Sequence, residues 1–154
     1  MRAEIINVTN GTLQGNKFTM VRGDTFEVTL RVIKNDESPL SIDRFEPLGV
    51  GQKTREPNSE SNNRLSMEFR AEVREGGEVP VIYRTTEQPT DILYGPLDEL
   101  TVVIDQNATK DLPAPITLNF DMQLTEFMFG PDYQRVNTVY QGSLQIEKDY
   151  TRKY

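Results

Sequence analysis

Two segments near the C-terminal end of the chain alternate between apolar and polar residues with a period of two. In residues 117–125 the apolar positions are Leu118, Phe120, Met122 and Leu124. In the segment that follows, the positions sharing one parity are Val136, Thr138, Tyr140, Gly142, Leu144 and Ile146. Because successive side chains of a strand point to opposite faces, each segment presents one face to a core. The pattern predicts a long β-hairpin within residues 112–152, with these positions facing inward.

The same alternation predicts further strands earlier in the chain. It is strongest in residues 25–32, 65–74 and 100–104, and shorter apolar runs occur at 5–8, 18–20 and 79–83. Turn residues separate these runs, and no segment shows a sustained helical period. About seven short strands of this kind predict an all-β fold, a single antiparallel β-sandwich of immunoglobulin-like size spanning residues 1–154. The chain lacks the cysteine and tryptophan residues that mark the core of antibody-type domains.

A polar segment interrupts the strand pattern at residues 51–64. Its sequence, GQKTREPNSESNNR, contains no aliphatic or aromatic residue, so it has nothing to bury in a core. The composition predicts a long exposed loop, and loops of this length in compact domains commonly carry contacts. A contact loop and a surface insertion without a specific role are both open at this point.

Charge and composition narrow the classes of function. The formal net charge is −7 and the isoelectric point is about 4.7, which argues against binding to nucleic acid or to an anionic membrane surface. The chain has no histidine and no cysteine, so it lacks the commonest general base and the thiolate nucleophile. No signal-peptide pattern and no apolar stretch of ~18 residues is present, which predicts a soluble protein.

Two short motifs have both a functional and a structural interpretation. Arg22-Gly23-Asp24 is an integrin-type tripeptide, but Gly-Asp before a strand is ordinary turn chemistry, and a turn is the expectation. Asp105, Asn107, Thr109 and Asp111 resemble the start of a calcium-binding loop. An EF-hand requires glycine and glutamate where Lys110 and Ile116 stand, so only a weak calcium site is open here.

Catalysis is not expected. A pair of carboxylates is the one acid–base arrangement that the composition allows, and 24 acidic residues make some such pair inevitable. The chain contains no nucleophile elbow, phosphate-binding loop or metal-ligand cluster. The sequence therefore predicts a non-enzymatic protein without a cofactor.

Five segments together carry a resemblance to a known family: residues 22–26, 100–105, 116–123, 138–146 and 149–152. They resemble small immunoglobulin-like β-sandwich proteins of tailed bacteriophage particles, including the N-terminal domains of baseplate upper proteins and tail, neck or head accessory proteins. The segment 42–64 departs from the compact form of that family. The resemblance implies a virion structural protein that binds other virion proteins, capsid, neck or tail subunits, in multiple copies under the symmetry of the particle. It leaves open whether the protein is a head decoration, a fibre anchor, or a tail, neck or baseplate component.

Six residues are the candidates for the interface. They are Phe127, Met128, Phe129 and Tyr133 at the predicted hairpin tip, and Arg152 and Tyr154 in a cationic, aromatic tail. An apolar hairpin tip commonly marks an interface, but this one has a second possible role, folding back under the edge of the sandwich. The alternative function is a module that binds host-surface glycans or proteins through exposed aromatic side chains, with Tyr83 and Tyr94 as additional candidates.

Overall fold

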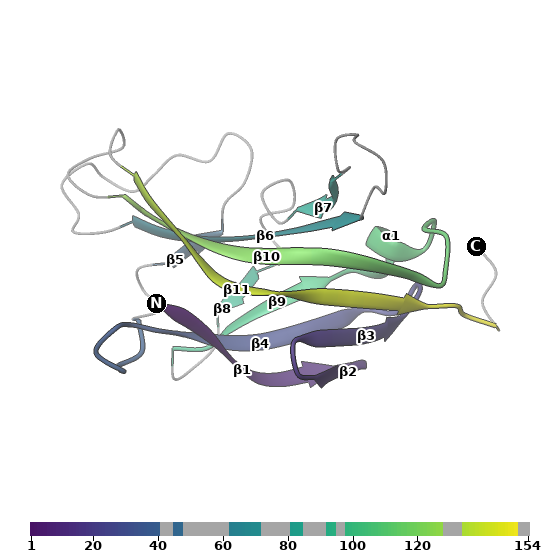
Figure 1. Ribbon diagram of the computed structural model, residues 1–154, viewed down its shortest axis with the longest axis horizontal. Helices are drawn as coiled ribbons and strands as arrows, with labels where there is room; N and C mark the ends of the chain where they lie inside the picture. The colour runs from purple at the N-terminus through teal and green to yellow at the C-terminus, as the bar shows by residue number, and fades with distance from the viewer. Residues whose placement is uncertain are drawn as a thin grey trace.

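The structure is a computed structural model that describes residues 1–40, 45–47, 62–71, 81–84, 92–94, 98–127 and 134–150. Side chains are described in residues 1–40, 98–124 and 135–150. The described residues form two β-sheets and one short helix, and the sheets pack face to face (Figure 1). The all-β sandwich predicted from the sequence is confirmed.

One sheet has four strands in the order β1-β4-β9-β8. Their bounds are Arg2–Thr9 for β1, Phe26–Ile33 for β4, Leu100–Ile104 for β9 and Ile92–Tyr94 for β8. The other sheet has the order β2-β3-β11-β10-β6-β5, and β7 pairs with β6 beside this path. Its strands are β2 (Gly11–Gln14), β3 (Lys17–Val21), β5 (Phe45–Pro47), β6 (Asn62–Ala71), β7 (Val81–Arg84), β10 (Ile116–Phe127) and β11 (Gln134–Glu147).

The strand order is that of an immunoglobulin-like sandwich. Seven strands in chain order, β1, β4, β6, β8, β9, β10 and β11, occupy the places of strands A to G, with A-B-E-D in one sheet and C-F-G in the other. The four remaining strands are short additions to the second sheet. Most pairings are antiparallel as expected, but β3 runs parallel to β11 and β5 runs parallel to β6.

The chain passes from the first sheet into the second at Asn10, between β1 and β2. Asn10 has a positive φ of 60°, and its side-chain amide donates to the carbonyl of Thr25 at 2.8 Å. After this kink, β2 forms a hairpin with β3, and β3 pairs with the last residues of β11. Strands β3, near the beginning of the chain, and β11, near its end, therefore lie side by side in the second sheet.

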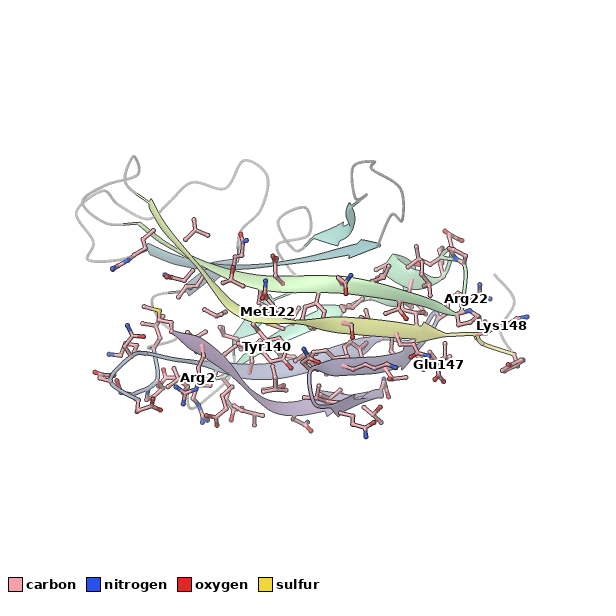
Figure 2. All side chains as sticks on the ribbon, viewed as in Figure 1. Arg2, Arg22, Met122, Tyr140, Glu147 and Lys148 are labelled. Carbon is pink, nitrogen blue, oxygen red and sulfur yellow. The ribbon has the colours of Figure 1, made fainter. Side chains whose placement is uncertain are left out.

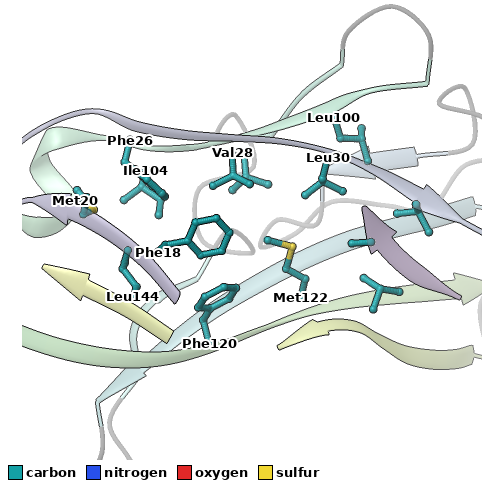
Figure 3. Close-up of a cluster of buried hydrophobic side chains, with 14 of the residues drawn as sticks. Phe18, Met20, Phe26, Val28, Leu30, Leu100, Ile104, Phe120, Met122 and Leu144 are labelled. Carbon is teal, nitrogen blue, oxygen red and sulfur yellow. The ribbon is translucent and has the colours of Figure 1, made fainter. Parts of the chain in front are cut away.

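The core lies between the two sheets and is built from the predicted inward positions. The buried side chains of β4, β9 and β10 follow a period of two: Phe26, Val28, Leu30, Val32, Leu100, Val102, Ile104, Leu118, Phe120, Met122 and Leu124. Phe18 of β3 joins the sheets, because its ring packs edge-on against Phe26 with the centroids 5.8 Å apart, and at a tilt against Phe120 with the centroids 5.4 Å apart (Figure 3). Full burial of each large apolar side chain contributes roughly 1.5–3 kcal/mol.

A β-bulge in β11 changes which of its residues face the core, so part of the prediction for this strand is wrong. Met122 pairs with Tyr140 and the next residue, Gln123, pairs with Thr138, so Val139 is an extra residue in β11. The alternation therefore changes phase at Val139. Leu144 and Ile146 face inward as predicted, but Thr138 and Val136 do not: Val136 is 53% exposed, whereas Val139 is 5% exposed.

The predicted loop 51–64 ends earlier than expected. Residues 62–64 already belong to β6, where Asn62 pairs with Phe127 and Asn63 pairs with Phe45 of β5. These three residues form part of a strand despite their polar composition, because neighbouring strands on both sides supply hydrogen-bonding partners. Residues 51–61 lie outside the described part of the chain.

Candidate functional site

The hairpin-tip candidates are attached to one end of the second sheet. Phe127 is the last residue of β10 and pairs with Gln134 of β11 on one side and Asn62 of β6 on the other. Met128, Phe129 and Tyr133 lie outside the described residues, as do Arg152 and Tyr154. The segment 128–133 joins β10 to β11, and the segment 48–61 joins β5 to β6, so both are attached at this end (Figure 1).

The tail candidates are attached to the opposite end. The 14 residues of β11 separate Tyr133 from the tail, which at ~3.3 Å per residue is roughly 40 Å of strand. Arg152 follows Asp149 by three residues, a reach of about 10 Å at most. The described residues to which the two groups of candidates are attached, Phe127 and Gln134 for the tip and Tyr150 for the tail, therefore lie at opposite ends of β11.

A polar cluster fixes the chain where the tail begins. The Arg22 guanidinium donates to the Asp149 carboxylate at 2.6 Å and to the Leu112 carbonyl at 3.0 Å. The backbone N–H of Arg22 also donates to the carbonyl of Glu147 at 2.9 Å. The Asp149 side chain is only 5% exposed, so this charge-assisted contact is well shielded from water. The cluster joins residues 127 positions apart, and Figure 2 shows Arg22, Glu147 and Lys148 together at this end.

The Arg22-Gly23-Asp24 motif is a structural turn, as predicted. The N–H of Asp24 donates to the carbonyl of Val21 at 3.1 Å, and Gly23 has a positive φ of 80°. The arginine is held in the polar cluster, and the N–H of Gly23 donates to the hydroxyl of Thr109 at 2.9 Å. An accessible, extended arginine side chain, which an adhesion motif requires, is not present at Arg22.

The segment that resembles the start of a calcium-binding loop makes structural contacts. Asp105 precedes the short helix α1 (Gln106–Thr109), and its carboxylate accepts from the Asn107 amide at 3.1 Å. Thr109 is buried and accepts the hydrogen bond from Gly23. Among the described residues, no group of three or more acidic, histidine or cysteine side chains gathers in a position to hold a metal ion. The alternating polar residues are explained by this helical turn.

A shallow hollow of about 340 Å³ lies where β1 begins and β11 begins. It is lined by Met1, Lys34, Asn35, Asp36, Arg135 and Asn137. The Asp36 carboxylate accepts hydrogen bonds from the hydroxyl and the backbone N–H of Ser38. Both bonds, the one from the hydroxyl more strongly, hold the pKa of the Asp36 carboxyl below its usual value. The lining carries both signs of charge, with the side chains of Lys34 and Arg135 beside the Asp36 carboxylate.

No helix among the described residues is long and apolar enough to cross a membrane. Sequence reasoning missed the contact of Arg22 with Asp149 and the buried hydroxyl of Thr109. Comparison with protein-family models and with curated proteins gives no match to this chain.

Proposed function

We propose that the protein is a non-enzymatic structural subunit of a tailed bacteriophage particle and that it works by protein–protein contact. Its neighbours would be capsid, neck or tail subunits, and its place would be the virion, as a head decoration, a fibre anchor, or a tail, neck or baseplate component. The proposal rests on the resemblance of five separate segments and on how those segments meet in space.

The observation that carries the proposal is the assembly of these segments into one unit. Residues 22–26 and 149–152 are joined through the Arg22–Asp149 ion pair. Residues 116–123 of β10 pair with residues 138–146 of β11. Residue 26 belongs to β4, which pairs with residues 100–104 of β9. The matching segments thus form neighbouring strands and a shared ion pair in one sandwich, which agrees with the architecture that the resemblance implies.

The placement of the candidate residues suggests how such a subunit acts. The hairpin tip and the tail are attached about 40 Å of strand apart, with a rigid sandwich between them. A subunit with contacts at both ends connects two neighbours at a fixed spacing. Under particle symmetry the same contact is repeated, and multivalency turns individually weak contacts into durable attachment.

Purified particles of the phage that encodes the chain provide the test. The proposal expects the protein in the mass spectrum of intact particles, in a fixed ratio to the major capsid protein. Immunogold labelling then separates the positions, with gold over the heads for a decoration or fibre anchor and gold at one vertex or along the tail for a neck, tail or baseplate part. Absence of the chain from intact particles by both methods contradicts the proposal.

The hairpin tip has its own test. Replacing Phe127 and Phe129 with serine distinguishes an interface from a core role. An unchanged melting temperature with failed incorporation into particles identifies the tip as an interface. A large fall in melting temperature identifies these side chains as part of the core and removes the tip from the proposed contact surface.

A further inference from the structure

The passage of the chain between the two sheets requires two particular residue types in succession. Asn10 has a φ of 60°, in the left-handed region that asparagine tolerates better than most residues with a side chain. A Cβ atom added at Gly11 would lie less than 3.0 Å from the Phe26 ring and from the Thr19 carbonyl oxygen, so position 11 has no room for one. Backbone geometry and packing therefore select asparagine followed by glycine at this crossing.

The same pair of residues is chemically labile. The backbone nitrogen of the residue after an asparagine is placed to attack Cγ of the asparagine side chain and close a five-membered ring. A side chain on that next residue hinders the attack, and glycine has none. Asn10 is the only asparagine in the sequence that glycine follows. The crossing between the sheets therefore holds the most reactive asparagine of the chain.

The restraint on the Asn10 side chain is a weak one. The residue is exposed and lies between the end of β1 at Thr9 and the start of β2 at Gly11, outside both strands. Its side-chain amide donates to the carbonyl of Thr25 at 2.8 Å, and this hydrogen bond is exposed to water. A bond of this kind favours the closed arrangement by roughly two- to tenfold. Such a factor slows a reaction of the side chain without preventing it.

We propose that Asn10 is a modification site, at which the folded protein loses ammonia and gains a carboxylate. The Gly11 nitrogen forms a bond to Cγ of Asn10, the bond from Cγ to Nδ2 breaks, and the Gly11 proton leaves with that nitrogen as ammonia. Water then opens the cyclic imide at either of its carbonyl groups. One product is aspartate, and the other is isoaspartate, in which Cβ has become part of the main chain. The reaction needs water alone and does not depend on the virion proposal.

Either product weakens the attachment of the β2–β3 hairpin to the first sheet. A carboxylate at position 10 cannot donate to the Thr25 carbonyl, so two oxygen atoms face each other where a hydrogen bond stood. Thr9 pairs with Glu27, and the new negative charge therefore lies near an existing one on a chain of net charge −7. Isoaspartate also lengthens the main chain directly before the tightly packed Gly11.

Peptide mass spectrometry of the incubated protein tests the reaction. Trypsin cleaves after Arg2 and Lys17, and the peptide between these sites contains Asn7, Asn10 and Asn16, so three asparagines are compared in one fragment. Each conversion of an amide to a carboxyl raises the mass by one dalton. In folded protein kept at mildly alkaline pH, we expect Asn10 to convert at least about tenfold faster than the other two, because valine and lysine follow those. Equal rates at the three positions, or no gain at Asn10, overturns the proposal.

Two further measurements test the structural consequence. Asn10→Asp reproduces one product, and Asn7→Asp is the matched control, because it adds the same charge to an exposed β1 residue that pairs with Thr29. The melting temperature of Asn10→Asp should be about 2–6 °C below that of the control. Incubated wild-type protein, which folded before it was modified, should be cut by trypsin at Lys17 faster than fresh protein. Equal melting temperatures for the two variants, or equal cleavage of incubated and fresh protein, overturns the proposal.

Discussion

Gly142 provides a sharp test of how the two ends of the chain meet. It lies in the middle of β11, opposite Phe120, and the N–H of the next residue, Ser143, donates to the carbonyl of Asn16 at 3.1 Å. A Cβ atom added at Gly142 would lie less than 3.0 Å from that carbonyl oxygen and 3.1–3.2 Å from the Phe120 ring. A glycine within a strand suggests close backbone approach, and the structure confirms it.

The magnitude of the Gly142→Ala effect follows from three contributions. Overpacking against backbone costs about 1–3 kcal/mol, and displacing Asn16 weakens a hydrogen bond of about 1 kcal/mol. The reduced freedom of the unfolded chain returns roughly 0.4–1 kcal/mol. We therefore expect a net loss of about 1–3.6 kcal/mol in the free energy of unfolding, which for a domain of this size lowers the melting temperature by roughly 2–14 °C.

The assay is chemical denaturation with calorimetry, and the chain offers a matched control. Gly15 lies in the β2–β3 turn with a φ of 64° and nothing within 4 Å of an added Cβ. Gly15→Ala should cost about 1 kcal/mol, for the left-handed backbone conformation alone. Adding Phe120→Leu to Gly142→Ala should recover little, because the Asn16 carbonyl is backbone and remains in place. A Gly142→Ala protein within 0.5 kcal/mol of the wild type would refute this account of the close approach.

Three further predictions test other features of the described structure. Val139→Ser should lower the free energy of unfolding by about 1–3 kcal/mol because it places a hydroxyl at a buried position, whereas Val136→Ser should stay within ~0.5 kcal/mol; equal effects measured by denaturation would contradict the bulge. Asp149→Asn should destabilise the fold by about 1–3 kcal/mol, since a shielded, charge-assisted contact is lost, and thermal unfolding at low and high salt measures this. The side-chain hydrogen bonds from Arg2 lower the pKa of Glu37, so nuclear magnetic resonance titration should find this pKa below its usual value and Arg2→Gln should restore it. Because the folded pKa is lowered, any stability from this pair is present above about pH 4.3 and is lost as the pH falls through the folded pKa.

The sequence predicted which residues form the core better than it predicted how the strands pair. Alternation of apolar residues correctly identified the buried positions of β4, β9 and β10, because inward facing is a local property of a strand with period two. Pairing is not local: nothing in residues 17–21 distinguishes a parallel partner in β11 from an antiparallel one elsewhere. The bulge at Val139 was also not predictable from local sequence. Positions 136 and 139 are both valine, so the alternation of apolar residues does not show which of the two faces inward.

The candidate site was predictable only in part for a related reason. Arg22-Gly23-Asp24 was correctly predicted to form a turn, but the contact of Arg22 with Asp149 depends on the parallel pairing of β3 with β11, which brings residues 21 and 147 into register. The same pairing begins at Lys17 and Ser143, where the Ser143 N–H donates to the Asn16 carbonyl beside Gly142. One feature of the topology therefore sets both the close backbone approach at Gly142 and the anchoring of Asp149. If Gly142→Ala and Asp149→Asn both weaken the fold, both results follow from where β3 begins and ends.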